Sequence, residues 1–398
     1  MVERKTTGLF TLGILSMIIT HALVHAAGNL RPILYPILMD EFQLTNLQIG
    51  IIAAVPPLTQ AVFSIPSGWV SDRYGAKKII IASLVMAATG ALLAGLAPNA
   101  WVYILASVFL TLTSTFYHPP SHVYCAIAVP KDDRAKAMGM LNAGGTFGIS
   151  LGPLSITVLM GMLFFTWRQL YLFWVPLILL GIVLMLVVKT DKYVNGENGN
   201  AHDEHVEETD PEEVESLLTR EFITYISSRG VRMFAGSMLS AFMSIYLSIV
   251  RGFTISQLGL MFGIGGVLGL VVSPIGGFMA TRFGEKRWVL LSQGIGTAFL
   301  IGAFFTSGVY PFIVMYLAYR FCGIISMPAM AAITARLSPP SQMGMGFALS
   351  FMPSAITGIV GPVFAAWIAD TYGYFPIFMV AGVVSYLGLG VFSLAVKD

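Results

Sequence analysis

Long apolar stretches separated by short polar turns run through the whole chain. A helix that crosses a bilayer needs about 20 mainly apolar residues. On that measure the pattern predicts twelve membrane-spanning helices, at residues 9–38, 45–70, 78–97, 101–129, 137–160, 169–188, 221–250, 255–280, 288–307, 310–335, 343–369 and 374–396. The predicted fold class is therefore an all-α membrane protein with two six-helix halves.

One polar stretch, residues 190–219, interrupts this pattern and holds ten of the chain's twenty acidic residues. Such a composition cannot bury enough apolar surface to fold, so it predicts a solvated linker. The expected domains are a bundle over residues 1–189, an acidic linker over 190–219 and a second bundle over 220–398.

Composition supports a membrane protein, because 56% of the 398 residues are hydrophobic and only 11% are charged. Cys125 and Cys322 both fall in apolar segments, which argues against a disulfide scaffold. The first apolar segment lacks a cleavage site after a short apolar core, so we expect an uncleaved helix. No nucleic-acid signature and no cofactor motif is found.

Basic residues predict the orientation of the chain in the membrane. Sixteen of the 22 Lys and Arg residues flank the predicted helices on the side that carries the termini, and two lie on the other side. Because Lys and Arg accumulate in cytoplasmic loops, we expect a multi-pass protein of the cell membrane with both termini in the cytoplasm.

The halves look like copies of each other, since ten residues recur at a fixed offset of 209. The pairs include Thr45 with Thr254, Gln48 with Gln257, Gly68 with Gly277, Arg73 with Arg282, Gly75 with Gly284, Lys77 with Lys286 and Pro153 with Pro362. Repeats related by an axis along the membrane normal are typical of transporters, with a substrate site near the bilayer midplane.

The stretch GWVSDRYGAKK, residues 68–78, resembles the signature loop of the major facilitator superfamily, and GFMATRFGEKR, residues 277–287, resembles its second copy. The resemblance assigns a conformational switch to Gly68, Asp72, Arg73, Gly75 and Lys77. Thr281 replaces the acid in the second copy, so the first copy is the expected switch. The resemblance implies a monomeric twelve-helix transporter that works by alternating access.

A second motif lies in the predicted fifth helix. GGTFGISLGP, residues 144–153, resembles the glycine-proline motif of the family's drug and proton antiporters through Gly148, Gly152 and Pro153. Small residues at this spacing let two helices pack closely, and proline bends one of them. FYHPPSH, residues 116–122, resembles the corresponding stretch of fosmidomycin-resistance-like exporters.

Ionisable residues inside a membrane face water or a partner, so each is a candidate for function. Four arginines and four histidines lie within or near the predicted spans, whereas every acidic residue lies in a terminus, a turn or the linker, apart from Asp72 at a helix end. The site should therefore attract anions. The predicted substrate-binding residues are His21, His25, Arg31, Tyr35, His118, His122, Arg229, Arg232 and Arg320.

We expect Arg229 and Arg232 to bind an anionic head group. The alternative for Arg229 and Arg232 is a bond to a neighbouring helix carbonyl or snorkelling towards the cytoplasm. Arg31 and Arg320 either assist in binding or have a structural role. The histidines orient the substrate, shuttle protons or pack structurally, because histidine titrates near neutral pH. The predicted function is transport of a small organic anion, with export by proton-coupled antiport favoured.

Several alternatives stay open. His21 with His25, and His118 with His122, have the i, i+4 spacing of metal ligands, which suits export of a metal ion or an anionic metal chelate. Anion uptake or exchange, an intramembrane enzyme and a non-transporting receptor are the others. An enzyme is disfavoured because no carboxylate or serine elbow accompanies the histidines.

Overall fold

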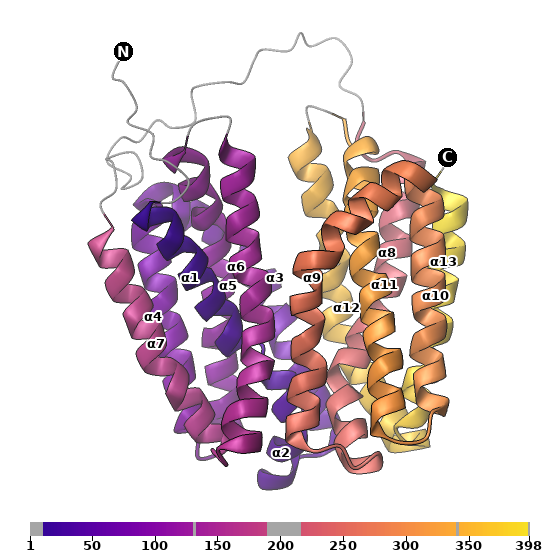
Figure 1. Ribbon diagram of the computed structural model, residues 1–398, viewed down its shortest axis with the longest axis horizontal. Helices are drawn as coiled ribbons and strands as arrows, with labels where there is room; N and C mark the ends of the chain where they lie inside the picture. Colours follow the sequence, from indigo (N-terminus) through magenta and orange to yellow (C-terminus); the bar gives the residue numbers. More distant parts are fainter. Residues whose placement is uncertain (1–10, 130–132, 189–215, 340–341, 397–398) are drawn as a thin grey trace. The chain divides into compact units, whose positions relative to one another are not determined.

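The computed structural model describes residues 11–129, 133–188, 216–339 and 342–396, and every regular element in these ranges is helical (Figure 1). Each of the twelve predicted spans corresponds to one helix or to two consecutive helical segments. Eleven of them are long and apolar enough over their described residues to cross a membrane, and the twelfth, α9, contributes the shorter apolar stretch Ile255–Gly269. Most of the predicted linker, with His202 and His205, lies outside the described residues.

The chain divides into two compact units, one of residues 1–31 and 59–210 and the other of residues 32–58 and 211–398. The first unit contains α1 (Leu12–Gly28), most of α3 (Asn46–Tyr74), α4 (Ala76–Gly95), α5 (Ala100–Ala128), α6 (Arg134–Ser155), the π-helical η2 (Ile156–Met162) and α7 (Trp167–Val187). Within it α1 packs on α6, and α4 packs on both α5 and α7.

The second unit repeats this packing. It contains α2 (Arg31–Glu41) from residue 32 onward, the start of α3, α8 (Arg220–Ile245), the π-helical η3 (Tyr246–Val250), α9 (Ile255–Phe283), α10 (Glu285–Phe305), α11 (Val309–Arg336), α12 (Met343–Tyr372) and α13 (Phe375–Ala395). Here α8 packs on α12, and α10 packs on both α11 and α13. These are the pairs that the offset of 209 predicts from the first unit.

The repeat also appears in the backbone. Thr45 and Gln48 exchange hydrogen bonds at the start of α3, with Gln48 N donating to Thr45 Oγ1 at 3.2 Å and Thr45 N donating to Gln48 Oε1 at 2.8 Å. Thr254 and Gln257 do the same at the start of α9. Such a capping box satisfies amides that the first helical turn leaves unbonded.

The signature loops share a second feature, since Gly75 and Gly284 both have φ of 85°. A residue with a Cβ is strained in this region, whereas glycine adopts it freely. One residue therefore suffices to turn the chain from α3 into α4 and from α9 into α10.

The predicted first span, residues 9–38, is two helices rather than one. Asn29 ends α1, and both its backbone N–H and its side-chain Nδ2 donate to the His25 carbonyl, at 3.1 and 2.8 Å. Pro32 then lacks the N–H that a continuous helix would need. Residues 32–58 pack within the second unit, where the Ser244 hydroxyl donates to the Pro32 carbonyl.

Candidate functional site

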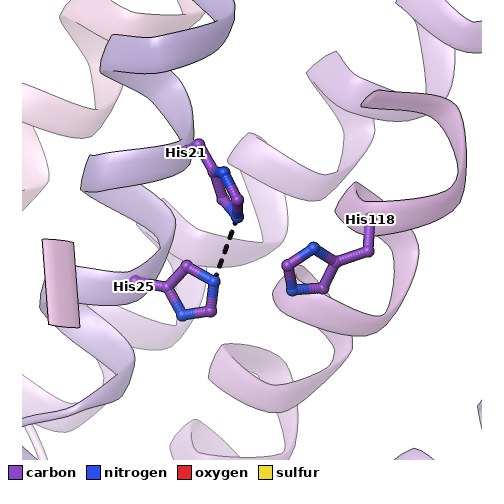
Figure 2. A group of neighbouring side chains, drawn as sticks. All are labelled: His21, His25 and His118. Carbon is purple, nitrogen blue, oxygen red and sulfur yellow. Dashed lines mark hydrogen bonds between the residues drawn. The ribbon is translucent and has the colours of Figure 1, made fainter. Parts of the chain in front are cut away.

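Three histidines meet in the interior of the first unit. His21 and His25 lie on α1, His118 lies on α5, and their ring centroids are 4.9 to 5.2 Å apart. Figure 2 shows the three rings turned toward one another, and we call them the histidine cluster. His122 lies next to it, with its ring centroid 6.2 Å from that of His118.

Packing around His21 fixes the orientation of this cluster. His21 Nδ1 donates to the Leu141 carbonyl of α6 at 2.7 Å, and the Tyr117 ring stacks on the imidazole at 5.3 Å. Gly145 of α6 leaves room for the ring, because an added Cβ there would lie 2.5 Å from His21 Cε1. His25 Nε2 lies 3.1 Å from His21 Nε2. His122 Nδ1 instead bonds to the His118 carbonyl at 2.7 Å.

Arg31 is held by hydrogen bonds to the protein. Its Nη1 donates to the Ser107 carbonyl and to Thr111 Oγ1 of α5, both at 2.9 Å, and its Nε donates to the Gly28 carbonyl at 3.2 Å. These bonds hold the Arg31 side chain against α5 within the first unit. Tyr35, which was predicted to bind substrate with Arg31, is buried on α2 among the residues of the second unit.

A cavity of about 280 Å³ lies inside the second unit, and we call it the arginine pocket. Four helices line it. The lining residues are Arg229, Arg232 and Met233 of α8, Gln293 of α10, Ser326, Met327, Met330, Ala331 and Thr334 of α11, and Phe347, Ser350 and Phe351 of α12. The pocket thus combines two cations with hydroxyl, amide, thioether and aromatic groups, and none of the lining side chains is acidic.

The two arginines keep donors without acceptors. Arg229 Nη1 donates to Tyr225 Oη at 3.2 Å, and its guanidinium carbon lies 5.7 Å from the centre of the Phe351 ring. The buried Nε atoms of Arg229 and Arg232 have no hydrogen-bond partner among the described residues. The aliphatic part of the Arg232 side chain packs on Gly388 of α13, because an added Cβ on Gly388 would collide with Arg232 Cγ.

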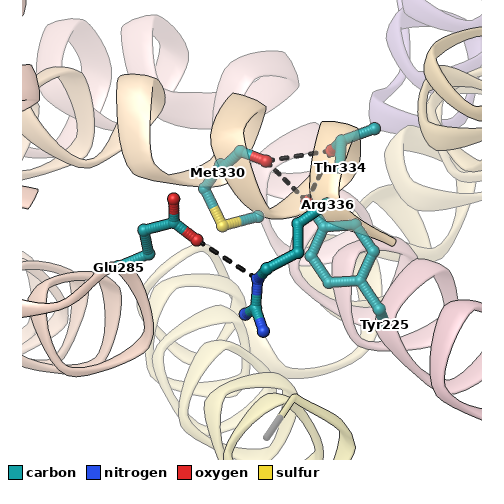
Figure 3. Close-up of polar contacts among 5 residues, drawn as sticks. All are labelled: Tyr225, Glu285, Met330, Thr334 and Arg336. Atoms are coloured by element: carbon teal, nitrogen blue, oxygen red, sulfur yellow. Dashed lines mark hydrogen bonds and ion pairs between the residues drawn. The ribbon is translucent and has the colours of Figure 1, made fainter. Parts of the chain in front are cut away.

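Two neighbouring polar groups shape the pocket further. Gln293 Nε2 donates to Ser326 Oγ at 2.5 Å. The other amide atom, the buried Gln293 Oε1, has no hydrogen-bond partner among the described residues. Tyr225 Oη is fixed by the Met330 carbonyl at 2.9 Å and by Thr334 Oγ1 at 2.8 Å (Figure 3). The sequence analysis did not predict Gln293 as a site residue, although a glutamine inside an apolar span indicates a possible polar site.

Arg320 does not line the arginine pocket. It lies on α11 with an exposed side chain, and its Nε lies 3.3 Å from where a Cβ on Gly265 of α9 would be. The structure therefore groups Arg229 with Arg232 and leaves Arg320 and Arg31 elsewhere.

The signature loop of the first unit is anchored by its basic residues. Lys77 Nζ donates to the Val188 carbonyl at 2.6 Å and to the Leu186 carbonyl at 3.3 Å, at the C-terminal end of α7. The Arg73 guanidinium carbon lies 5.3 Å from the centre of the Trp69 ring. The side chain of Asp72 lies outside the described part of the structure. An added Cβ on Gly68 would meet no atom within 4 Å.

The glycine-proline motif packs α6 on α1. A Cβ on Gly148 would collide with the Ala22 carbonyl oxygen, and one on Gly152 would collide with the Ala26 carbonyl oxygen. Pro153 lies inside α6, and the π-helical η2 begins three residues later at Ile156. The backbones of α6 and α1 thus approach closely at these two glycines.

Comparison with known proteins gives one consistent result. The family model of the Major Facilitator Superfamily matches residues 16–272 and 225–398. The chain is 24% identical over 376 residues to "Multidrug resistance protein MdtG" of Citrobacter koseri, covering 92% of this chain and 90% of the relative. It is also 24% identical over 368 residues to "Multidrug resistance protein 2" of Bacillus subtilis, covering 91% of this chain and 90% of the relative.

Solved structures share the fold at low sequence identity. A bacterial homologue of the human lysosomal transporter Spinster, in an inward-facing and occupied conformation, superimposes with a TM-score of 0.81 at 15% identity, over 96% of each chain. The peptide transporter POT in complex with sulfate superimposes with a TM-score of 0.77 at 14% identity, over 98% of this chain and 95% of that one. The family match and these transporter structures support a transporter rather than an enzyme.

Proposed function

The chain belongs to the major facilitator superfamily, and from that premise we propose that it carries a small organic anion across the membrane by alternating access. It is a multi-pass secondary transporter with a small-molecule substrate. The anionic charge of the substrate, the direction of transport and the coupling ion are our proposals.

The observation that carries the proposal is the pair of unpartnered guanidinium Nε atoms of Arg229 and Arg232. A buried hydrogen-bond donor without an acceptor is unfavourable, because it loses its hydrogen bonds to water and gains none in return. No acidic residue lines the arginine pocket, so a carboxylate, phosphonate or similar group of the substrate is the natural acceptor.

The rest of the lining supports an organic anion with an apolar part. Three methionines and two phenylalanines contribute to the pocket, and methionine adapts to ligands of different shape. The unpartnered Gln293 Oε1 is an acceptor, so it favours a substrate that also carries an N–H or O–H donor.

We propose export for two reasons. The relatives at 24% identity are named multidrug resistance proteins, and an inside-negative membrane potential favours the exit of an anion by about 2.3 kcal/mol per charge and 100 mV. The glycine-proline motif that packs α6 on α1 resembles that of drug and proton antiporters, which supports exchange against protons. We also propose a monomer in the cytoplasmic membrane with both termini in the cytoplasm.

The test is transport into proteoliposomes, using a panel of radiolabelled organic anions, cations and neutral compounds. We expect transport of anions only, and an increase in KM of about 10- to 100-fold in Arg229→Gln and in Arg232→Gln. The matched control is Arg251→Gln, because Arg251 Nη2 donates to the Thr306 and Gly308 carbonyls outside the pocket. Transport of cations that neither pocket substitution affects would overturn the proposal.

Coupling is tested in the same vesicles. An imposed pH gradient, at clamped membrane potential, should accelerate anion transport in the direction opposite to proton flow. Equal rates with and without the gradient would reject proton antiport and leave uniport or exchange of anions.

A further inference from the structure

We propose that His21, His25 and His118 form a binding site for one divalent transition-metal ion. Each residue offers one ring nitrogen, and these three atoms all lie within 4.8 Å of one another. The site lies in the first unit, so it rests on different residues from the arginine pocket of the second unit.

The spacing is close to that of a bound ion. Zinc binds histidine nitrogen at about 2.0–2.1 Å in tetrahedral geometry, which puts the ligand nitrogens about 3.3 Å apart. His21 Nε2 and His25 Nε2 are already 3.1 Å apart, because they lie one helical turn apart on α1. The third nitrogen, on His118 of α5, lies within 4.8 Å of the other two, so a bound ion would draw it closer by at most about 1.5 Å.

His21 has the support that metal ligands usually have. A histidine that binds a metal through one nitrogen commonly donates its other N–H to a carbonyl or carboxylate, which fixes the tautomer and the ring orientation. His21 Nδ1 donates to the Leu141 carbonyl at 2.7 Å, so Nε2 carries the lone pair in the neutral ring. The stacked Tyr117 ring and Gly145 hold the imidazole in place from α5 and α6.

Binding requires no proton to leave the protein when the rings are neutral. In the free site His25 Nε2–H donates to His21 Nε2. On binding, the proton of His25 moves to its Nδ1 and the Nε2 lone pair binds the ion. Three lone pairs are then shared with the metal, and the charge of the site rises by two.

The chemistry of the site selects the ion. Three imidazoles suit zinc, cobalt, nickel and copper, whereas magnesium and calcium prefer oxygen ligands. His21 is buried, while His25 and His118 keep partial exposure, so the cluster is not fully enclosed by protein. Among the described residues, the three candidate ligands are all histidines and include no carboxylate. The fourth coordination position of the ion would therefore take water, hydroxide or an anionic ligand.

The test is Co²⁺ titration of the purified full-length protein in detergent, with a histidine-free affinity tag. His202→Ala and His205→Ala are introduced first, so that only His21, His25, His118 and His122 remain. We expect one Co²⁺ per chain with the visible absorption of a four-coordinate nitrogen site, displacement by Zn²⁺ and no response to Mg²⁺.

Variants of the cluster decide whether these residues are the ligands. His25→Gln and His118→Gln should each weaken Co²⁺ binding at least about 10-fold, whereas His122→Gln should retain it. Gly145→Ala keeps every ligand but displaces the His21 ring, so it should also weaken binding. Circular dichroism and gel filtration verify folding. Absence of stoichiometric Co²⁺ binding, or an unchanged Co²⁺ affinity in either His25→Gln or His118→Gln, would overturn the proposal without bearing on anion transport.

Discussion

Tyr117 and Tyr225 make the same pair of hydrogen bonds in the two units, but from opposite helices. Tyr117 of α5 donates to the Met17 carbonyl at 2.9 Å and pairs with Thr20 Oγ1 at 2.8 Å, both on α1. Tyr225 of α8 donates to the Met330 carbonyl at 2.9 Å and pairs with Thr334 Oγ1 at 2.8 Å, both on α11. The same polar contact thus joins α1 to α5 in the first unit and α8 to α11 in the second. The two tyrosines are not equivalent in the repeat, because they are not 209 residues apart.

Removing the hydroxyl should have one effect that is common to both tyrosines and one that is specific to Tyr225. Tyr117→Phe and Tyr225→Phe should each lower the free energy of unfolding by about 0.5–1.5 kcal/mol, the usual worth of a hydrogen bond. Only Tyr225→Phe should raise the KM for the anion, because Tyr225 Oη is also the acceptor of Arg229 Nη1. Thermal unfolding in detergent and transport kinetics measure the two effects, and equal KM values in both variants would contradict the role of Tyr225.

A second prediction concerns the packing of α6 on α1. Gly148→Ala should destabilise the protein by about 1–3 kcal/mol, because the added methyl collides with the Ala22 carbonyl and the helices must separate. Gly139→Ala on the same helix is the control, since a Cβ there would meet no atom within 4 Å. Alanine stabilises a helix relative to glycine by up to about 1 kcal/mol, so this control should melt at the same or a higher temperature.

Lys77 should stabilise the end of α7. Its ammonium group donates to the Val188 and Leu186 carbonyls, where the helix exposes unbonded acceptors and a partial negative charge. We expect Lys77→Met to lower the free energy of unfolding by about 0.3–1 kcal/mol and to speed amide exchange in the last turn of α7. Lys78→Met is the neighbouring exposed control, and faster exchange in that variant too would refute a specific role of Lys77.

Tyr374 makes stability depend on alkaline pH. It lies between the spans of α12 and α13, its hydroxyl donates to Asn46 Oδ1 at 2.8 Å, and burial raises the pKa of its phenol above the ordinary value near 10. The unfolded chain therefore loses this proton first, so the contribution of Tyr374 is complete below about pH 10 and is lost as the pH rises through the folded pKa.

We expect Tyr374→Phe to remove that part of the pH dependence. The difference in melting temperature between the wild-type protein and Tyr374→Phe should be constant from pH 7 to 9 and shrink above about pH 10. Tyr372→Phe, at an exposed neighbour, is the control. A difference that stays constant to the highest pH tested would show that burial of the phenol has no such effect.

The fold was predictable because bilayer thickness sets helix length, and apolar length is visible in the sequence. The start of α4, predicted at 78, is observed at Ala76, and the start of α10, predicted at 288, is observed at Glu285. The break after Gly28 was not predicted, although Asn29 and Pro32 signal a helix end and a helix start.

The candidate site was predictable only in part. Helical spacing places His21 with His25, and His118 with His122, on common faces, but it does not tell which faces meet. The meeting of α1 and α5 at His118, with His122 left beside the cluster, depends on packing around Tyr117 and Gly145. Likewise, the sequence paired Arg229 with Arg232 but did not reveal the unpartnered Gln293 Oε1 beside them.

The matching capping boxes at Thr45 and Thr254 bear on the origin of the molecule. Both halves keep the same capping box at the start of a helix. They differ in their interior polar groups, which are the imidazoles of the histidine cluster in one half and the guanidinium groups of the arginine pocket in the other. Duplication of an ancestral six-helix gene explains this contrast. The duplicates retained the signals that build the scaffold and diverged in the polar groups of their interiors.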